Sequence, residues 1–299
     1  MDEIKRWESA HSIISKAARE GWNSLKFQIS IREKSLIQGV LPITNVKLSD
    51  LSPSVREDSK SRLLFPKDVS HENLTPIEVL GDGNCFFRSI SNSLFGSEGR
   101  HVECRVRCMI ELVMNTSRYL RQDTYTDMSS NRADMHYVLE TSISDEARVS
   151  DDMTKSLQNE ILRSVKNGYY SSLIHLYASV NALNRRIVTI FPSIQNVTIN
   201  REVHNQTVRP LPQTSQRNGP PLFIMWTHTS NTNLINWRPN HFVSCHEKSD
   251  SSQESTLEDP PLKKHKVSDD FPAHSNEPGD PDKDMPSKDP DEQEMPGVY

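Results

Sequence analysis

Apolar residues recur at helical spacing directly after a glycine-containing turn in the first third of the chain. Phe86, Ile90 and Leu94 follow one another every four residues, and they form one stripe of a helix that should end near Gly96. The pattern therefore predicts an amphipathic helix whose first residue is Cys85.

Similar spacing predicts further helices, and runs of β-branched and aromatic residues predict strands, most of them late in the chain. The helices are expected over residues 1–27, 102–120, 150–167 and 169–183, and the strands over residues 76–80, 185–191, 221–226 and 241–245. Residues 121–148 are more polar and their pattern is weaker. Because helices come first and strands gather late, the sequence predicts a mixed α/β, or α+β, domain.

Composition divides the chain into three parts. Residues 1–72 form a partly helical N-terminal arm, which prolines break in its second half, and this arm could pack on the main domain or stay mobile. Residues 73–247 hold the dense apolar pattern of a folded domain. Residues 248–299 contain 8 of the 18 prolines. We expect this tail to be disordered, because it buries too little apolar surface to offset its ordering entropy.

Charge follows the same division. The tail after Glu247 carries 14 of the 40 acidic and 6 of the 35 basic residues, which leaves 26 acidic and 29 basic residues in the body. A body this close to neutral gives no reason to expect a nucleic-acid partner. Within the tail, PPLKKHKV holds Lys263, Lys264 and Lys266, a cluster typical either of a nuclear import signal or of a solvated charge run that arose by chance.

The remaining composition indicates an intracellular protein. The chain has no run of about 18 apolar residues, so no membrane span or membrane partner is expected. The start, MDEIKRWESA, lacks the apolar segment of a secretory signal. Four cysteines in 299 residues do not suggest a disulfide framework. We therefore expect a reduced protein in the cytoplasm, the nucleus or both.

The stretch LGDGNCFFR gives Cys85 a distinctive setting. A cysteine at a helix N-terminus meets the positive end of the helix dipole and unpaired N–H groups, which favour the thiolate. Gly81 and Gly83 permit a tight turn and leave backbone amides uncovered for the oxyanion of a tetrahedral intermediate. Asp82 or Asn84 could brace this loop by hydrogen bonds to its backbone. The alternative is a buried structural cysteine.

A thiol nucleophile needs a base, normally a histidine far away in the sequence. Among the eleven histidines, His241 is the first candidate, because it follows a long polar stretch and opens the strand HFVSC. His246 is the second candidate. His136 and His175 lie on predicted helices, where surface or core positions are the simpler interpretation.

The stretch DGNCFFRSIS, followed at a distance by NHFV, resembles the ovarian-tumour (OTU) family of cysteine proteases over about residues 75–246. The stretches GRHVECRVRCMIELVMN and SSLIHLYASVNALNRRIVTIFP are more similar to the vertnin-like and transposon-associated OTU branch than to the well-studied deubiquitinases. The resemblance implies a papain-like fold in which a small central sheet packs between helices.

The resemblance also implies hydrolysis of isopeptide or peptide bonds at the C-terminus of ubiquitin or a ubiquitin-like protein, with no metal or organic cofactor. Cys85 would be the nucleophile, and His241 would be its general base and later its general acid. Asp82 would match the family's aspartate three residues before the cysteine, and Gly83 and Asn84 would belong to the oxyanion loop. We expect a monomer that binds ubiquitin or a relative of it.

One position departs from the family pattern. Many members carry Asn or Asp two residues after the histidine to orient its ring, and Val243 stands there in this chain. Losing the group that holds a catalytic imidazole can cost several orders of magnitude in rate. Asn240, Asn236 or Asp82 could replace it from another direction. The alternative function is a catalytically inactive OTU-like module that binds a partner protein or acts in the nucleus.

A metal site is not expected. His101, Cys104 and Cys108 fall on one helix face at spacings of three and four. Structural zinc normally takes four ligands, and the sequence offers no clear fourth one, so a packed helix face is the preferred interpretation.

Overall fold

The computed structural model describes residues 2–38, 41–66, 71–121, 135–192, 204–211, 219–229 and 239–248. The chain divides into one unit over Met1–Ser251 and another over Ser252–Tyr299. From residue 249 onward, the tail predicted to be disordered lies outside the described residues, and so does its lysine cluster, Lys263, Lys264 and Lys266.

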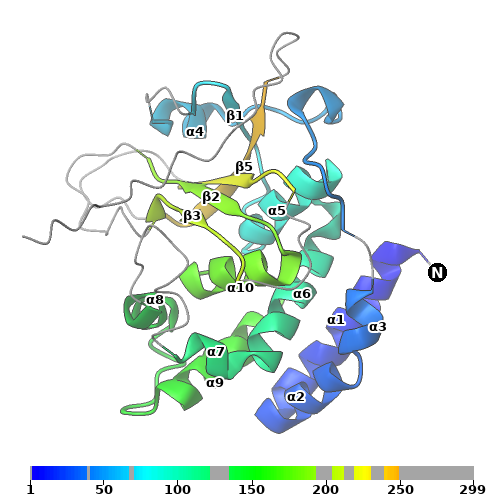
Figure 1. Cartoon of the computed structure of the whole chain (residues 1–299), viewed down its shortest axis with the longest axis vertical. Coiled ribbons are helices and arrows are strands. Elements are labelled where there is room, and N and C mark those ends of the chain that lie inside the picture. The colour runs from blue at the N-terminus through cyan, green and yellow to red at the C-terminus, as the bar shows by residue number, and fades with distance from the viewer. Residues whose placement is uncertain are drawn as a thin grey trace, which may run out of the picture. The chain divides into compact units, whose positions relative to one another are not determined.

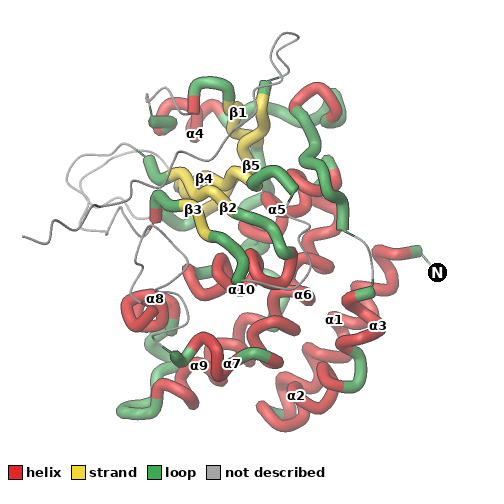
Figure 2. Tube along the Cα trace, in the orientation of Figure 1, coloured by secondary structure: helices red, strands yellow, loops and turns green. Residues whose placement is uncertain are grey.

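The described part of the first unit combines helices with one sheet (Figures 1 and 2). Its α-helices are α1 (Glu3–Glu20), α2 (Trp22–Ser30), α3 (Glu33–Ile37), α4 (Ser59–Leu64), α5 (Cys85–Phe95), α6 (His101–Met114), α7 (Thr116–Tyr119), α8 (Met135–Ser142), α9 (Met153–Ser164) and α10 (Leu173–Leu183). Its strands are β1 (Leu74–Ile77), β2 (Ile187–Ile190), β3 (Thr207–Val208), β4 (Leu222–Thr227) and β5 (His241–Glu247).

The five strands form a single sheet in the order β1-β5-β4-β2-β3. Strand β5 runs antiparallel to both of its neighbours, β1 and β4, whereas β2 and β4 are parallel. Strand β5 is therefore an interior strand, and its register pairs His241 with Thr227 at one end and Glu247 with Leu74 at the other. This topology places the first residue of β5 at the end of the sheet where β4 finishes.

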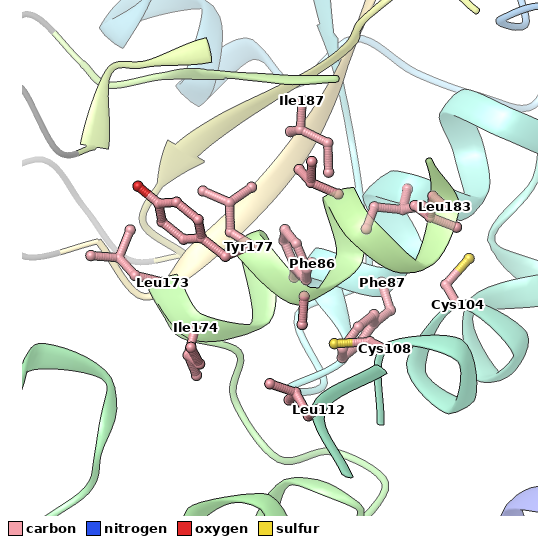
Figure 3. Close-up of a cluster of buried hydrophobic side chains, with 14 of the residues drawn as sticks. Phe86, Phe87, Cys104, Cys108, Leu112, Leu173, Ile174, Tyr177, Leu183 and Ile187 are labelled. Carbon is pink, nitrogen blue, oxygen red and sulfur yellow. The ribbon is translucent and has the colours of Figure 1, made fainter. Parts of the chain in front are cut away.

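The core lies where α5 and α10 meet the sheet and α6 packs against both helices (Figure 1). Phe86 and Phe87 point from α5 into this core, where their rings make an edge contact with centroids 5.2 Å apart (Figure 3). Phe86 also makes an edge contact with Phe242 of β5, at 5.1 Å. These contacts fix the start of α5 against the start of β5.

The N-terminal helices belong to the same unit as the sheet. Helices α1 and α2 pack on each other and on α6, and the Trp7 ring is 1% exposed beneath the guanidinium of Arg107. His11 bonds through Nε2 to the carbonyl of Val165 at 2.8 Å. The sequence left open whether the arm packs on the main domain or stays mobile, and helices α1 and α2 pack on it.

The structure corrects several predicted boundaries. The helix predicted over residues 1–27 is interrupted at Gly21, which has a φ of +111° that other residues rarely adopt. The helix predicted over 102–120 ends at Met114, and a separate short helix, α7, follows it. The strand predicted over 76–80 is shifted toward the N-terminus, because residues 74–77 are the ones that pair with β5.

Helices α3 and α4, helix α8 and strand β3 have no counterpart among the predicted elements. Helix α8 lies within residues 121–148, where the sequence is polar and its pattern weak, and it buries Met135, Val138 and Leu139. Strand β3 has only two residues and pairs antiparallel with β2. Both are stabilised by contacts with distant segments, which a local pattern does not record. Among the described helices, none is long and apolar enough to cross a bilayer.

Candidate active site

Cys85 is the first residue of α5, as the sequence predicts, and only 2% of it is exposed. Burial raises the pKa of its thiol to about 11, although the backbone N–H groups of Phe242 and Phe86 act in the opposite direction. The negative charge of Asp82 raises it further. The expectation that the helix start would favour the thiolate is therefore outweighed by desolvation, and the group is a neutral thiol at neutral pH.

Gly83 is required by the path of the loop before Cys85. Its φ is +82°, and a Cβ at this position would lie 1.9 Å from the carbonyl oxygen of Gly168. Gly168 itself has a φ of +79° and belongs to the connection between α9 and α10. The two backbones therefore touch at a point where no side chain fits, and no local pattern in the sequence indicates this role of Gly168.

Gly81 brings the loop against the proposed base. A Cβ at Gly81 would lie 3.7 Å from both Nδ1 and Cε1 of His241. The loop that precedes Cys85 and the imidazole of His241 are thus in van der Waals proximity, and the backbone N–H of the next residue, Phe242, acts on the Cys85 sulfur. The structure therefore places His241 beside the loop that leads to Cys85.

His241 opens β5 and is 5% exposed. Burial lowers the pKa of its imidazole, while the charge of Asp58 and the backbone of Val79 act to raise it. The neutral ring is the form that accepts a proton at neutral pH. Its Nδ1 is buried and has no hydrogen-bond partner among the described residues.

Asn240 and Asp82, the described groups proposed to orient His241, are engaged with other residues. Val243 is completely buried in β5 and offers no hydrogen-bonding group. Asn240 accepts a hydrogen bond from the Thr229 N–H at 3.0 Å, and its Nδ2 lies 3.4 Å from the hydroxyl of the same threonine. Asn240 therefore braces the junction of β4 and β5. Asn236 lies outside the described residues.

His246, the second candidate base, has a structural role instead. Its Nδ1 bonds to the carbonyl of Val46 at 2.9 Å, and its Nε2 lies 3.2 Å from the hydroxyl of Ser244. Both ring nitrogens are engaged. His241 is accordingly the better placed of the two histidines.

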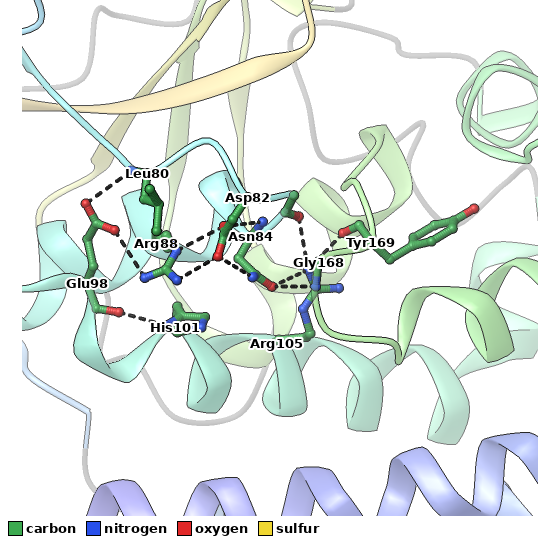
Figure 4. Close-up of polar contacts among 10 residues, drawn as sticks. Leu80, Asp82, Asn84, Arg88, Glu98, His101, Arg105, Gly168 and Tyr169 are labelled. Atoms are coloured by element: carbon green, nitrogen blue, oxygen red, sulfur yellow. Dashed lines mark hydrogen bonds and ion pairs between the residues drawn. The ribbon is translucent and has the colours of Figure 1, made fainter. Parts of the chain in front are cut away.

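Asp82 is the centre of a polar network that holds the outer side of the loop (Figure 4). Its carboxylate accepts bonds from Arg88 at 2.7 and 3.1 Å and from the backbone and side-chain nitrogens of Asn84 at 3.0 and 2.9 Å. Burial by itself raises the pKa of Asp82, but these bonds and the Arg88 charge outweigh it and hold the pKa well below its usual range. Arg88 also pairs with Glu98, whose other oxygen accepts the Leu80 N–H. Asp82 therefore braces the loop, as predicted.

Arg105 holds the inner side of the same loop and was missed by the sequence analysis (Figure 4). It projects from α6, is 1% exposed, and donates hydrogen bonds to the Gly83 carbonyl and the Asn84 side chain. The sequence pattern could have predicted its burial. Arg105 falls three residues after Val102 and four before Met109, within the apolar stripe of its helix.

The three residues weighed as metal ligands do not form a site. Cys104 and Cys108 are buried in the core, where Cys108 donates to the His175 carbonyl at 3.6 Å. His101 bonds through Nδ1 to the carbonyl of Glu98 at 2.8 Å. Within the described ranges, no group of three metal-binding side chains gathers in one place.

Comparison with known protein families assigns the chain to a family. The family described as "Vertnin, OTU domain" matches residues 76–227, which is half of the chain. The chain belongs to the vertnin OTU-domain family. This assignment confirms the resemblance found in the sequence, and the small sheet among helices is the fold class that was predicted. The matched region includes Cys85 and ends before His241.

Individual relatives agree with the family. The chain is 30% identical over 169 residues to vertnin of Ailuropoda melanoleuca, which covers 53% of the chain and 22% of the relative. It is 28% identical over 184 residues to vertnin of Bos taurus, which covers 58% of the chain and 26% of the relative. The chain thus spans about a quarter of the length of these vertnins.

Solved OTU domains show a more distant likeness. The OTU domain of OTUD1 shares 13% identity with a TM-score of 0.35, over 60% of this chain and 89% of that domain. The viral OTU protease of Farallon virus shares 17% identity with a TM-score of 0.34, over 58% of this chain and 85% of that one.

Proposed function

We propose that this vertnin-type OTU domain is a thiol protease that hydrolyses the bond at the C-terminus of ubiquitin or a ubiquitin-like protein. The observation that carries the proposal is the close approach of the Cys85 loop to His241, since a Cβ at Gly81 would lie 3.7 Å from the imidazole. A nucleophile at a helix start and a neutral imidazole beside it are the two groups that acyl transfer requires.

In this proposal the Cys85 sulfur attacks the carbonyl carbon of the scissile bond while its proton passes to His241. The N–H groups at the start of α5 have no partners within the helix and stabilise the oxyanion. His241 then gives the proton to the leaving amine, and a water molecule hydrolyses the thioester with His241 again acting as base. Asp82 takes no proton in these steps, because its low pKa keeps it ionised and bonded to Arg88.

A second candidate function is an OTU-like module that binds ubiquitin or another protein without cleaving it. The observation that favours it is the buried valine at position 243, which offers no side-chain group to orient the His241 ring. An imidazole that lacks an orienting side chain is a weaker base for this chemistry.

The test is labelling by a ubiquitin probe that carries an electrophile at its C-terminus. We expect the probe to attach to Cys85 and to fail with Cys85→Ala. Cys104→Ala, which alters a buried core cysteine away from the site, should leave labelling intact. If soluble, folded protein binds ubiquitin but is not labelled, the protease proposal fails and the binding module is supported.

We further propose an intracellular location, which the four free cysteines support. Lys263, Lys264 and Lys266 are the residues proposed to direct the protein to the nucleus. A fluorescent fusion should lose nuclear signal when the three lysines become alanine, and an unchanged distribution would remove the import signal from the proposal.

A further inference from the structure

Arg105 is a buried cation without a carboxylate partner. It is 1% exposed, and no salt bridge to it is found in the part of the chain that the structure describes. Burial lowers the pKa of its guanidinium to about 10. Because burying a charge carries a desolvation penalty, the position of Arg105 in the core needs an explanation beyond ordinary packing.

The partners of Arg105 belong to two separate segments. Nη2 donates to the Gly83 carbonyl at 3.2 Å, the Asn84 Oδ1 at 2.9 Å and the Tyr169 carbonyl at 2.8 Å, and Nη1 donates to the Ser164 carbonyl at 2.7 Å. Two of these acceptors lie in the loop before Cys85. Of the other two, Ser164 is the last residue of α9 and Tyr169 lies in the connection that follows it. One guanidinium therefore joins the two segments (Figure 4).

Two further contacts make the same junction. The Gly168 N–H donates to the Asn84 Oδ1 at 3.1 Å, so that this oxygen is shared with Arg105. The Gly83 and Gly168 backbones are packed with no room for a side chain. The Arg105 guanidinium also lies over the Phe87 ring at 4.5 Å, which fixes it against α5.

We propose that Arg105 is a positioning residue that sets the conformation of the Cys85 loop by tying it to residues 164–169. It acts through Gly83 and Asn84 and does not touch the reacting atoms. The proposal rests on the proposed thiol chemistry for its consequence in catalysis, but the positioning itself is independent of it. A lysine cannot replace it, because its single nitrogen lacks the planar fork that reaches acceptors on both segments.

The experiment compares Arg105→Lys with Arg107→Lys. Arg107 lies on the same helix, is 3% exposed, and pairs with Glu103 and the Trp7 ring instead of the loop. Both variants lose a buried guanidinium, so both should lower the melting temperature. Only Arg105→Lys should speed hydrogen exchange in residues 80–84 and 164–169 together.

Cys85 gives a second readout that needs no substrate. Because the loop is loosened, iodoacetamide should alkylate Cys85 in Arg105→Lys about tenfold faster than in Arg107→Lys. Labelling by the ubiquitin probe should move the other way and fall about 100-fold, because the reacting groups lose their alignment. If Arg105 had a purely structural role, the alkylation rate and the probe labelling would change equally in the two variants.

The outcomes separate the two proposals. If Arg105→Lys shows exchange and alkylation no faster than Arg107→Lys, the positioning role is overturned. If those changes appear but the wild-type protein is never labelled by the probe, the positioning role stands and the protease proposal fails. Should Arg105→Lys not fold, Asn84→Ala removes the shared acceptor while keeping the arginine, and it must show the same two changes on a smaller scale.

Discussion

Two glycines at opposite ends of α5 allow the packing of the Cys85 loop to be measured. Gly83 precedes the helix with a φ of +82°, and Gly96 follows it with a φ of +69°. Alanine at either position must adopt a left-handed backbone. Only at Gly83 does the new Cβ meet backbone, since it would lie 1.9 Å from the Gly168 oxygen, whereas at Gly96 the nearest atom is a Val46 methyl at 3.3 Å.

The expected magnitudes follow from this difference. The left-handed conformation costs an alanine about 1–2 kcal/mol, and this should be nearly the whole effect of Gly96→Ala. Forcing extra atoms into a closed contact adds about 1–3 kcal/mol, because a carbonyl cannot move aside as a side chain can. Gly83→Ala should therefore lower the free energy of unfolding distinctly more than Gly96→Ala.

Urea unfolding of the two variants measures the difference, and labelling of Cys85 by the ubiquitin probe reports on the site. We expect Gly83→Ala to lose labelling under conditions where it is still folded, and Gly96→Ala to keep it. Equal unfolding free energies for the two variants, or normal labelling of Gly83→Ala, would refute the packing of this loop against Gly168.

Two other predictions concern the base and the pH. Val243→Asn should lower stability by about 1–3 kcal/mol, because it buries an amide, yet raise probe labelling by offering His241 a partner. A matched Val208→Asn on β3 should only destabilise, and a folded Val243→Asn with unchanged labelling would argue against a missing orienting group. Burial raises the pKa of Cys85 to about 11 and that of Cys108 to about 12, from 9.0. Stability should be full below pH 9 and fall as the pH rises toward 11, by about 1.4 kcal/mol per unit for each thiol. Urea unfolding across this pH range should show that the free energy of unfolding falls less steeply for Cys108→Ala than for the wild-type protein. A wild-type free energy that does not fall would contradict the assignment of buried neutral thiols.

The sequence predicted best those features that depend only on residues within one helix, strand or turn. The helix from Cys85 to Gly96 follows from apolar spacing of four and from a glycine that can end a helix, and both are properties of neighbouring residues. The opening of a strand at His241 is likewise local. The bracing role of Asp82 could be predicted because an aspartate in a turn readily bonds to the residues that follow it.

Local sequence patterns are therefore enough to predict the Cys85 helix, the strand that begins at His241 and the family resemblance. The surroundings of these elements depend on the packing of segments that are distant in the chain. Gly168 and Arg105 meet the loop from other segments, and no spacing in the chain records that meeting. Burial likewise reversed the thiolate expected at a helix start, because desolvation depends on everything packed around a group. Local patterns report the preference of a segment, whereas contacts and solvent exclusion depend on how distant segments pack together.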